Sequence, residues 1–403
     1  MFDYDLVILG HTVGGVAVAQ QAAQQGLRVA LVNQNCPPHL DAYIRYGLSH
    51  WSRRDTPWGE AIAQTNHSLA QITEQWSPAV LGLAGVDWVA GVGEFKSGSA
   101  LLLQVGERRL TSRAYLLALG RRPAQGIELK ELLQRDTLPA EVTILGNTLA
   151  AVELANSLQR LGVQVMLWEG ERLLPQEDPR LVQRIGAILE ARGVKRLKTP
   201  PVETGLLLDC QSHTPPPTAL NLAGVGVRSY QDRLLVNPYL QTTQPRIYAI
   251  GTDLGGYDLP QLERAEGAIA LYNSGHYWRK PMDYRTIPIT VYTDPPFARV
   301  GLTIAQAQQE YGPQVRCYQT YLKDTIASAL THRTTGLCRV LALPKGKILG
   351  AALLGGCAPE AIALFALALE QGLTLDQLPP HLFPHPSMSE TIPKVMDRGK
   401  RIE

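Results

Sequence analysis

The sequence is poor in charge and has almost no net charge, and each shortage excludes a class of function. Charged residues make up 18% of the 403 residues and the formal net charge is +2, so we expect no binding of nucleic acid or of an anionic membrane surface. The longest apolar stretch, residues 361–369, is far shorter than a membrane span. No basic and apolar leader precedes the first expected strand, so we expect no secretory signal.

Paired cysteines are also missing. The chain has five cysteines, an odd number, and no two of them form a CxxC or a CxxxxC motif. Scattered cysteines are typical of proteins in a reducing compartment, so we expect a cytoplasmic location and mostly inert, buried thiols. The five are Cys36, Cys210, Cys317, Cys338 and Cys357.

Two parts of the chain share the pattern of a strand, a Gly-rich turn, a helix and a second strand. In the first copy these elements are expected at residues 5–9, 10–15, 16–25 and 27–32. In the second copy they are expected at residues 142–145, 146–151, 152–160 and 163–168. The length exceeds one ordinary core, so two such units predict two nucleotide-binding domains.

The first Gly-rich turn is a candidate site for a pyrophosphate. A turn of the type GxGxxG brings backbone amides and a helix N-terminus to the phosphates, and an acidic residue after the next strand binds the ribose. Here Gly10, Gly14 and Gly15 are present, Thr12 replaces the middle glycine, and Asn33 stands at the acidic position.

The second turn departs from the pattern in a similar way. It keeps Gly146, has Thr148 in the middle and Ala151 at the end, and retains the acid as Glu169. A degenerate turn of this kind is often only a tight connection between a strand and a helix. The threonine side chain crowds the phosphate position, although its hydroxyl can donate to a phosphate oxygen.

The rest of the chain adds strands and a change of pattern. Residues 86–117 alternate as an antiparallel meander would, and residues 247–250 read as a buried strand followed by a helix over 262–273. From residue 283 onward strands and helices occur without nucleotide-binding turns, which predicts a further domain.

Four segments resemble motifs of the pyridine nucleotide-disulfide oxidoreductases, the family of glutathione reductase, dihydrolipoamide dehydrogenase and mercuric reductase. The segments ALGRRP, TTQPRIYAIG, IPITVYTDPPFARVGL and HPSMSE are similar to the family's ATGxxP strand, its second FAD motif, the start of its interface domain and its HPTxxE motif. They occupy residues 118–123, 242–251, 287–302 and 385–390. Their order matches that of the family across essentially the whole chain.

The resemblance implies an α/β fold with two Rossmann-like domains, the second inserted in the first, and a C-terminal α+β dimer-interface domain. The expected ranges are 1–124 with 222–282 for FAD, 125–221 for NAD(P), and 283–403 for the interface. It also implies FAD near Gly120 and Gly251, and a homodimer. The family's aspartate after the second FAD motif is Thr252 here, and the adjacent Asp253 could substitute for it.

The resemblance further implies catalytic positions. His385 and Glu390 match the family's acid-base pair, in which the histidine serves the flavin of the partner subunit. Glu153 matches the glutamate beside the flavin, but its usual lysine partner is absent from the sequence. Alternatives remain open: the histidine could be structural, and Cys36, in the sequence CPP, could be a surviving thiol or ordinary packing.

We therefore expect an FAD-dependent NAD(P)H oxidoreductase that passes electrons to a quinone, to oxygen or to another carrier instead of a disulfide. The alternative is a non-catalytic paralogue that acts as a nucleotide-binding or regulatory scaffold. The second nucleotide domain is shortened, which puts nicotinamide binding in question. If a nicotinamide binds, Glu169 favours NADH over NADPH, with Arg172 close enough to blur the preference. No metal site is expected.

Overall fold

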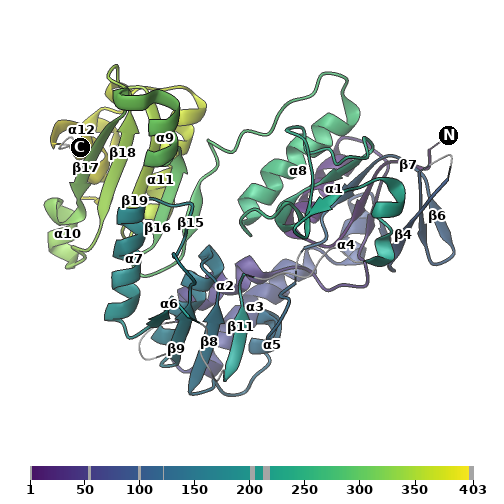
Figure 1. Ribbon diagram of the computed structural model, residues 1–403, viewed down its shortest axis with the longest axis horizontal. Coiled ribbons are helices and arrows are strands. Elements are labelled where there is room, and N and C mark those ends of the chain that lie inside the picture. The colour runs from purple at the N-terminus through teal and green to yellow at the C-terminus, as the bar shows by residue number, and fades with distance from the viewer. Residues whose placement is uncertain are drawn as a thin grey trace.

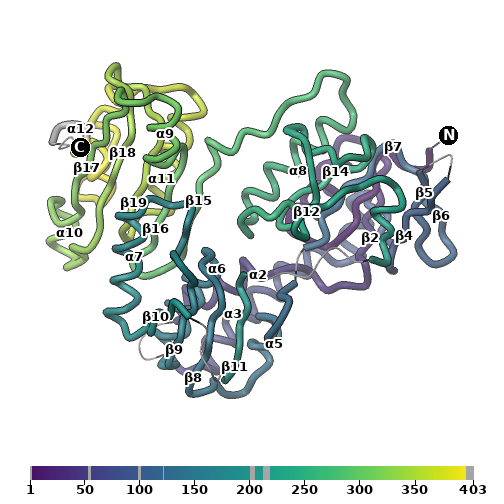
Figure 2. The backbone as a smooth tube through the Cα atoms, in the orientation of Figure 1, coloured from purple at the N-terminus to yellow at the C-terminus, as the bar shows by residue number. Residues whose placement is uncertain are grey.

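The computed structural model describes residues 2–52, 56–98, 101–120, 122–199, 205–211 and 218–398. Figure 1 shows three α/β parts, each built around its own sheet, and Figure 2 follows the backbone through them. The chain enters the first part, crosses to the second, returns to the first and ends in the third. This arrangement confirms the predicted fold class of two Rossmann-like units and a C-terminal domain. The exact domain boundaries remain predictions.

The first part is a parallel five-stranded sheet in the order β14-β7-β1-β2-β3. Its strands are β1 (Tyr4–Leu9), β2 (Val29–Val32), β3 (Val86–Val89), β7 (Ser112–Leu117) and β14 (Ile247–Ala249). The central strand β1 is fully buried over its last four residues, as its continuous apolar run predicts. Helices α1 (Val13–Gln24), α4 (Pro78–Leu83) and α8 (Pro260–Gly275) belong to this part, and α1 packs closely against α8.

The meander prediction for residues 86–117 was partly wrong. Only β4 (Gly93–Lys96), β5 (Leu102–Val105) and β6 (Arg108–Leu110) form an antiparallel sheet. The flanking strands β3 and β7 instead join the parallel sheet, β3 beside β2 and β7 beside β1. Alternation along the sequence does not distinguish these cases, because β7 is buried on both faces only through tertiary packing.

The second part has a parallel sheet in the order β10-β9-β8-β11. Its strands are β8 (Glu141–Leu145), β9 (Gln164–Trp168), β10 (Lys195–Leu197) and β11 (Leu206–Asp209), with helices α5 (Leu129–Leu132), α6 (Leu149–Arg160) and α7 (Pro179–Ala191). Two earlier helices, α2 (Asp41–Trp51) and α3 (Trp58–Glu74), were not predicted. Their buried side chains Ile44, Leu48 and Leu69 join the core of this second part.

The third part is an antiparallel sheet in the order β15-β16-β19-β18-β17. The strands are β15 (Ile289–Val291), β16 (Phe297–Gly301), β17 (Arg316–Tyr321), β18 (Leu337–Ala342) and β19 (Ile348–Leu354). Helices α9 (Ile304–Tyr311), α10 (Ile326–Thr331), α11 (Ala358–Glu370) and α12 (Thr391–Arg398) complete it. None of the helices in the described ranges combines the length and apolar character that crossing a bilayer requires.

Two buried ion pairs join the third part to the second. Arg299 Nε lies 2.5 Å from a carboxylate oxygen of Glu177, and Arg339 Nη1 lies 2.5 Å from one of Asp178. Asp178 has a second function, because its other carboxylate oxygen accepts from the amide of Arg180 and caps the N-terminus of α7.

Replacing Asp178 by alanine should therefore destabilise the protein by about 3–5 kcal/mol, since it leaves the Arg339 guanidinium buried without its carboxylate. Asp178→Asn is the matched control: asparagine also caps helices, so only the charge is lost. Urea unfolding followed by circular dichroism measures both variants. A loss confined to Asp178→Ala, with Asp178→Asn as stable as wild type, would contradict a dominant role for the ion pair.

Candidate active site

The first Gly-rich turn has the geometry of an anion-binding helix N-terminus. Thr12 is the N-cap of α1, and its hydroxyl oxygen accepts from the amide of Gly15 at 3.1 Å. Gly10 has a φ of 110°, and a Cβ there would lie 1.9 Å from the carbonyl oxygen of Ala118. Only glycine fits this close approach of the turn to the end of β7.

A carboxylate from α8 already contacts this turn. One oxygen of Glu263 accepts from the amide of Gly14 at 2.9 Å, and the other accepts from the hydroxyl of Thr12. Burial raises the pKa of Glu263, and the bonds from Thr12 and Gly14 oppose that shift. The Thr12 hydroxyl, which the sequence suggests could donate to a phosphate, donates here to Glu263, a residue that the sequence analysis missed.

Asn33, at the predicted ribose position, binds backbone. Its side-chain oxygen accepts from the amide of Asn35 at 3.0 Å and from the amide of Gly91 at 3.1 Å. These bonds tie the loop after β2 to the loop after β3. Asn33, which stands at the acidic position of the motif, therefore connects two loops at the carboxyl edge of the sheet.

The second FAD motif lies near the first turn, since Gly251 and Gly14 both lie against Glu263. The amide of Gly251 donates to Glu266 at 2.6 Å, and burial raises the pKa of Glu266 to about 7. Asp253 is buried, and its carboxylate accepts from the amide of Leu119 at 2.8 Å, directly before Gly120 in the ALGRRP segment. Asp253 therefore fixes the end of β7. The neighbouring Thr252 lines a cavity between the first two parts.

The second Gly-rich turn repeats the threonine cap but not the carboxylate. Thr148 is the N-cap of α6 and accepts from the amide of Ala151 at 3.3 Å. Its hydroxyl donates to the carbonyl oxygen of Cys210 at 3.0 Å. Gly146 has a φ of 137° and lies against the chain at Cys210 and Gln211. The groups that contact this turn are therefore backbone atoms near Cys210, and none of the contacts described above comes from a charged side chain.

Glu169 is fully buried, and two cations bind it. Arg196 Nη2 lies 2.8 Å and Lys198 Nζ 2.5 Å from the same carboxylate oxygen. Burial would raise the pKa of Glu169, but the bonds from Arg196 and Lys198 outweigh it and lower that pKa. The preference for NADH stays a prediction, but the negative charge on which it rests is offset by these cations. Arg172 donates instead to the carbonyl of Glu177.

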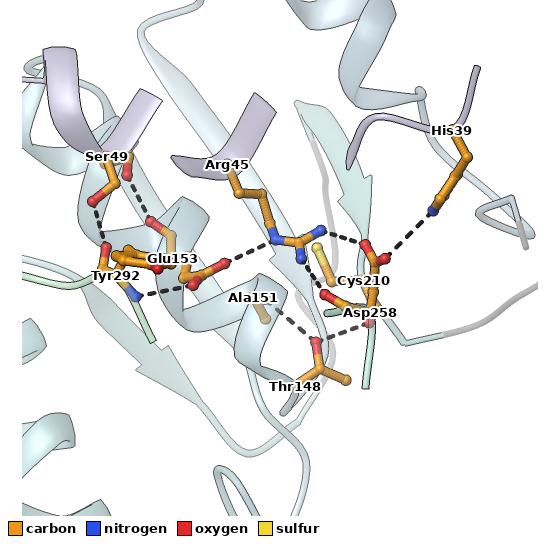
Figure 3. A network of polar contacts seen from close by, with 10 residues as sticks. His39, Arg45, Ser49, Thr148, Ala151, Glu153, Cys210, Asp258 and Tyr292 are labelled. Carbon is orange, nitrogen blue, oxygen red and sulfur yellow. Dashed lines mark hydrogen bonds and ion pairs between the residues drawn. The ribbon is translucent and has the colours of Figure 1, made fainter. Parts of the chain in front are cut away.

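A chain of charged side chains lies where the first two parts meet (Figure 3); Arg45 and Glu153 are buried, and His39 and Asp258 are partly exposed. The guanidinium of Arg45, on α2, donates to Glu153 on α6 at 2.8 Å and to the carboxylate of Asp258 at 2.8 Å. His39 Nε2 lies 3.6 Å from the other oxygen of Asp258. The lysine that usually accompanies this glutamate is absent, as the sequence indicates, and Arg45 from an unpredicted helix is the cation that binds Glu153 instead.

The charges in this network are mutually dependent. Burial raises the pKa of Glu153, and Arg45 opposes this. Burial also opposes ionisation of Asp258, but Arg45 and His39 outweigh it and lower its pKa. Burial disfavours the charged form of His39, yet Asp41, Asp258 and Glu263 outweigh it and raise the pKa of His39 to about 10.

The network lines a cavity of about 100 Å³. His39, Arg45 and Asp258 face it from one side, and Thr148 and Cys210 face it from the second Gly-rich turn. Burial raises the pKa of the Cys210 thiol to about 12, so this thiol is not a nucleophile near neutral pH. The cavity is smaller than the roughly 300–1,000 Å³ of typical ligand pockets.

Cys36 lies on another cavity, of about 520 Å³, which Gly120 and His39 also line. Its sulfur is 3.2 Å from the carbonyl oxygen of Gln34. All five cysteines are within the described residues and all are free.

His385 and Glu390 form a pair in the third part, apart from the network around Arg45. His385 Nδ1 lies 3.0 Å from a Glu390 oxygen that also accepts from the amide of Ser387 at 2.8 Å. Burial of Glu390 is outweighed by the Ser387 amide and by His385, so its pKa is lowered. The His385 side chain is 63% exposed. The pair is thus preformed and open to a partner.

The raised pKa of His39 predicts a pH-dependent contribution to stability. A cation whose pKa rises from 6.5 to about 10 on folding stabilises the protein fully below pH 6.5, and this stabilisation disappears as the pH approaches 10. The melting temperature of wild type should therefore exceed that of His39→Gln more at pH 6.5 than at pH 10, as measured by calorimetry. A difference that does not change with pH would contradict the assignment of this charge.

Comparisons with known proteins agree on one family. Residues 4–204 match the pyridine nucleotide-disulphide oxidoreductase model, and residues 287–396 match the dimerisation domain of the same family. The chain is 26% identical to mercuric reductase from Staphylococcus aureus, with 96% of this chain and 81% of that protein covered. It is 25% identical to glutathione reductase from a Nostoc species, with 96% and 98% covered.

Solved structures show the same fold. The HOCl-induced flavoprotein disulfide reductase RclA from Escherichia coli superposes with a TM-score of 0.86 at 22% identity, over 98% of this chain and all of that one. Members of the matched family are FAD-dependent and use NAD(P)H as the reductant. The chain belongs to the pyridine nucleotide-disulfide oxidoreductase family.

Proposed function

We propose that this protein is an FAD-dependent NAD(P)H oxidoreductase whose electron acceptor is a quinone, oxygen or another carrier and not a disulfide. The proposal is supported most directly by the residues found where the two nucleotide-binding parts meet, because they include no pair of cysteines. This place holds the ion pairs of Arg45 with Glu153 and Asp258 and the inert thiol of Cys210. The sequence contains no CxxxxC motif, and all five cysteines are free.

The donors of the first turn fit an anionic oxygen, because Thr12 and Gly14 already bind one, that of Glu263. The backbone of this turn, the N-terminus of α1 and Gly251 are the groups that would hold FAD. When bound, FAD supplies the exchange of electrons with the nicotinamide and the acceptor. The amides at the start of α6, beside Thr148, would hold the nicotinamide cofactor.

We assign to His385 the role of proton donor in this reaction. Glu390 accepts from its Nδ1 side, which orients the ring and leaves Nε2 directed away from the carboxylate. The third part matches a dimerisation domain, and α11 exposes Leu364 and Leu367, with 41% and 58% of their surface accessible. We therefore propose a two-fold dimer in which this apolar face is covered and His385 serves the partner's site.

Two observations favour the second candidate, a non-catalytic scaffold. Glu263 occupies the donors that a pyrophosphate needs, and the Arg45 network leaves a cavity of about 100 Å³ beside the second turn. A protein that never binds the cofactor would tolerate both features. The retained pair of His385 and Glu390 favours the oxidoreductase.

A thiol-independent activity distinguishes this proposal from disulfide reduction. Purified protein supplied with FAD and NADH or NADPH should reduce a soluble quinone, and Cys36→Ser should keep at least about half of that rate, because this thiol has no suitable partner. Thiol titration before and after reduction should give equal counts. Reduction of glutathione disulfide or lipoamide faster than quinone, or two additional thiols on reduction, would overturn the proposal.

The site across the dimer can be tested with mixed variants. His385→Ala should slow quinone reduction by roughly 100-fold or more, as for loss of a general acid, while FAD content and dimer mass stay unchanged. Gly14→Val should abolish FAD binding. Refolding the two variants together should restore one working site per hybrid dimer, and each variant refolded alone is the control. No recovered activity, or a monomer in solution, would contradict the arrangement.

A further inference from the structure

The bond between Glu263 and the first Gly-rich turn is an anion contact made inside the chain. The carboxylate comes from the first turn of α8, and it reaches the N-terminus of α1 although the two residues are 249 positions apart in the chain. The two helices pack side by side, which places the carboxylate over the turn.

We propose that Glu263 is an internal ligand of the first turn, which the pyrophosphate of FAD must displace, and that this residue therefore determines how tightly the chain holds the cofactor. The inference rests on the proposed function only in that FAD is the expected nucleotide. The contact itself exists in the free chain.

The donors of the first turn are already engaged. The Thr12 hydroxyl accepts from Gly15 and donates to Glu263, and the Gly14 amide donates to the second carboxylate oxygen. A phosphate oxygen that approached Thr12 and Gly14 would find both donors engaged. Each bond to an ionised acceptor is stronger than one between neutral groups, so the exchange has a real cost.

Glu263 also fills the space beside Gly14. A Cβ on Gly14 would lie 2.3 Å from Cγ and 2.8 Å from Cδ of Glu263. The clearance that a glycine provides for a phosphate in such a turn is thus filled by the glutamate side chain. A phosphate and the carboxylate cannot both occupy it.

The charge of Glu263 also opposes a second anion at this helix end. The N-terminus of α1 carries a partial positive charge that stabilises one nearby anion. With Glu263 in place, a pyrophosphate would meet a carboxylate of like sign. His39 partly compensates the negative charge of Glu263, and Asp258 adds to it. Arg45 anchors Asp258, five residues before Glu263, so we expect the exchange to involve rotation of the Glu263 side chain and not movement of α8.

The test is FAD binding by full-length protein stripped of any flavin, followed by quenching of FAD fluorescence. Glu263→Ala removes the competitor and should lower the Kd for FAD by about tenfold or more. Glu263→Gln keeps the size without the charge and should fall between Ala and wild type. Arg264→Ala, the exposed neighbour on the same helix, is the matched control and should stay within about twofold of wild type.

A second measurement compares melting temperatures without and with FAD. Without FAD, Glu263→Ala should melt at a lower temperature than wild type because two bonds to the turn are lost, and FAD should then raise its melting temperature more than that of wild type. If the alanine variant does not fold, the glutamine variant is judged by the same criteria.

The outcomes separate the two proposals. A Kd that is unchanged or higher in both Glu263 variants, with wild type binding FAD, overturns the role of Glu263 and leaves the proposed function standing. No binding of FAD by wild type or by any variant overturns both and supports the scaffold. Tighter binding in Arg264→Ala equal to that in Glu263→Ala would also count against the inference.

Discussion

The guanidinium of Arg45 is the constraint on which the arrangement of the three parts depends. It donates to Glu153 on α6 and to Asp258 in the segment before α8, so it joins the second part to the first. The other oxygen of Glu153 accepts from the amide of Tyr292, at the end of β15, which adds the third part. Removing one member of such a buried set leaves an uncompensated charge at a cost of about 3–5 kcal/mol.

Much of the fold follows from local signals in the sequence. The apolar runs of β1 and β8 and the glycines that close α1 and α6 are sufficient to predict both βαβ units, because buried parallel strands and tight turns have distinctive compositions. Helices α2 and α3 were missed. Their few buried residues contact the core of a part that the chain enters only later, so their short sequences carried no sign of a partner.

The candidate site was less predictable for a related reason. The turn residues Thr12 and Thr148 were recognised, but what each hydroxyl contacts depends on an element far along the chain: Glu263 for one and Cys210 for the other. Arg45 stands at an ordinary helix position and Asp258 at an ordinary loop position. No local pattern shows that these two side chains, 213 residues apart in the sequence, form a hydrogen bond of 2.8 Å. Pairings of this kind are set by tertiary packing.

The contact of Glu263 also changes how cofactor and stability are coupled. In a turn whose donors have no internal acceptor, a nucleotide at free concentration [L] stabilises the protein by RT ln(1 + [L]/Kd), and no hydrogen bond within the chain is lost when it binds. Here the free chain already satisfies the amide of Gly14 and the hydroxyl of Thr12. If FAD displaces Glu263 as proposed, the cofactor adds only the difference between its own bonds and those of the carboxylate. Occupancy of the site then depends on the concentration of free FAD. The preformed pair of His385 and Glu390 lies in the third part and does not take part in that equilibrium.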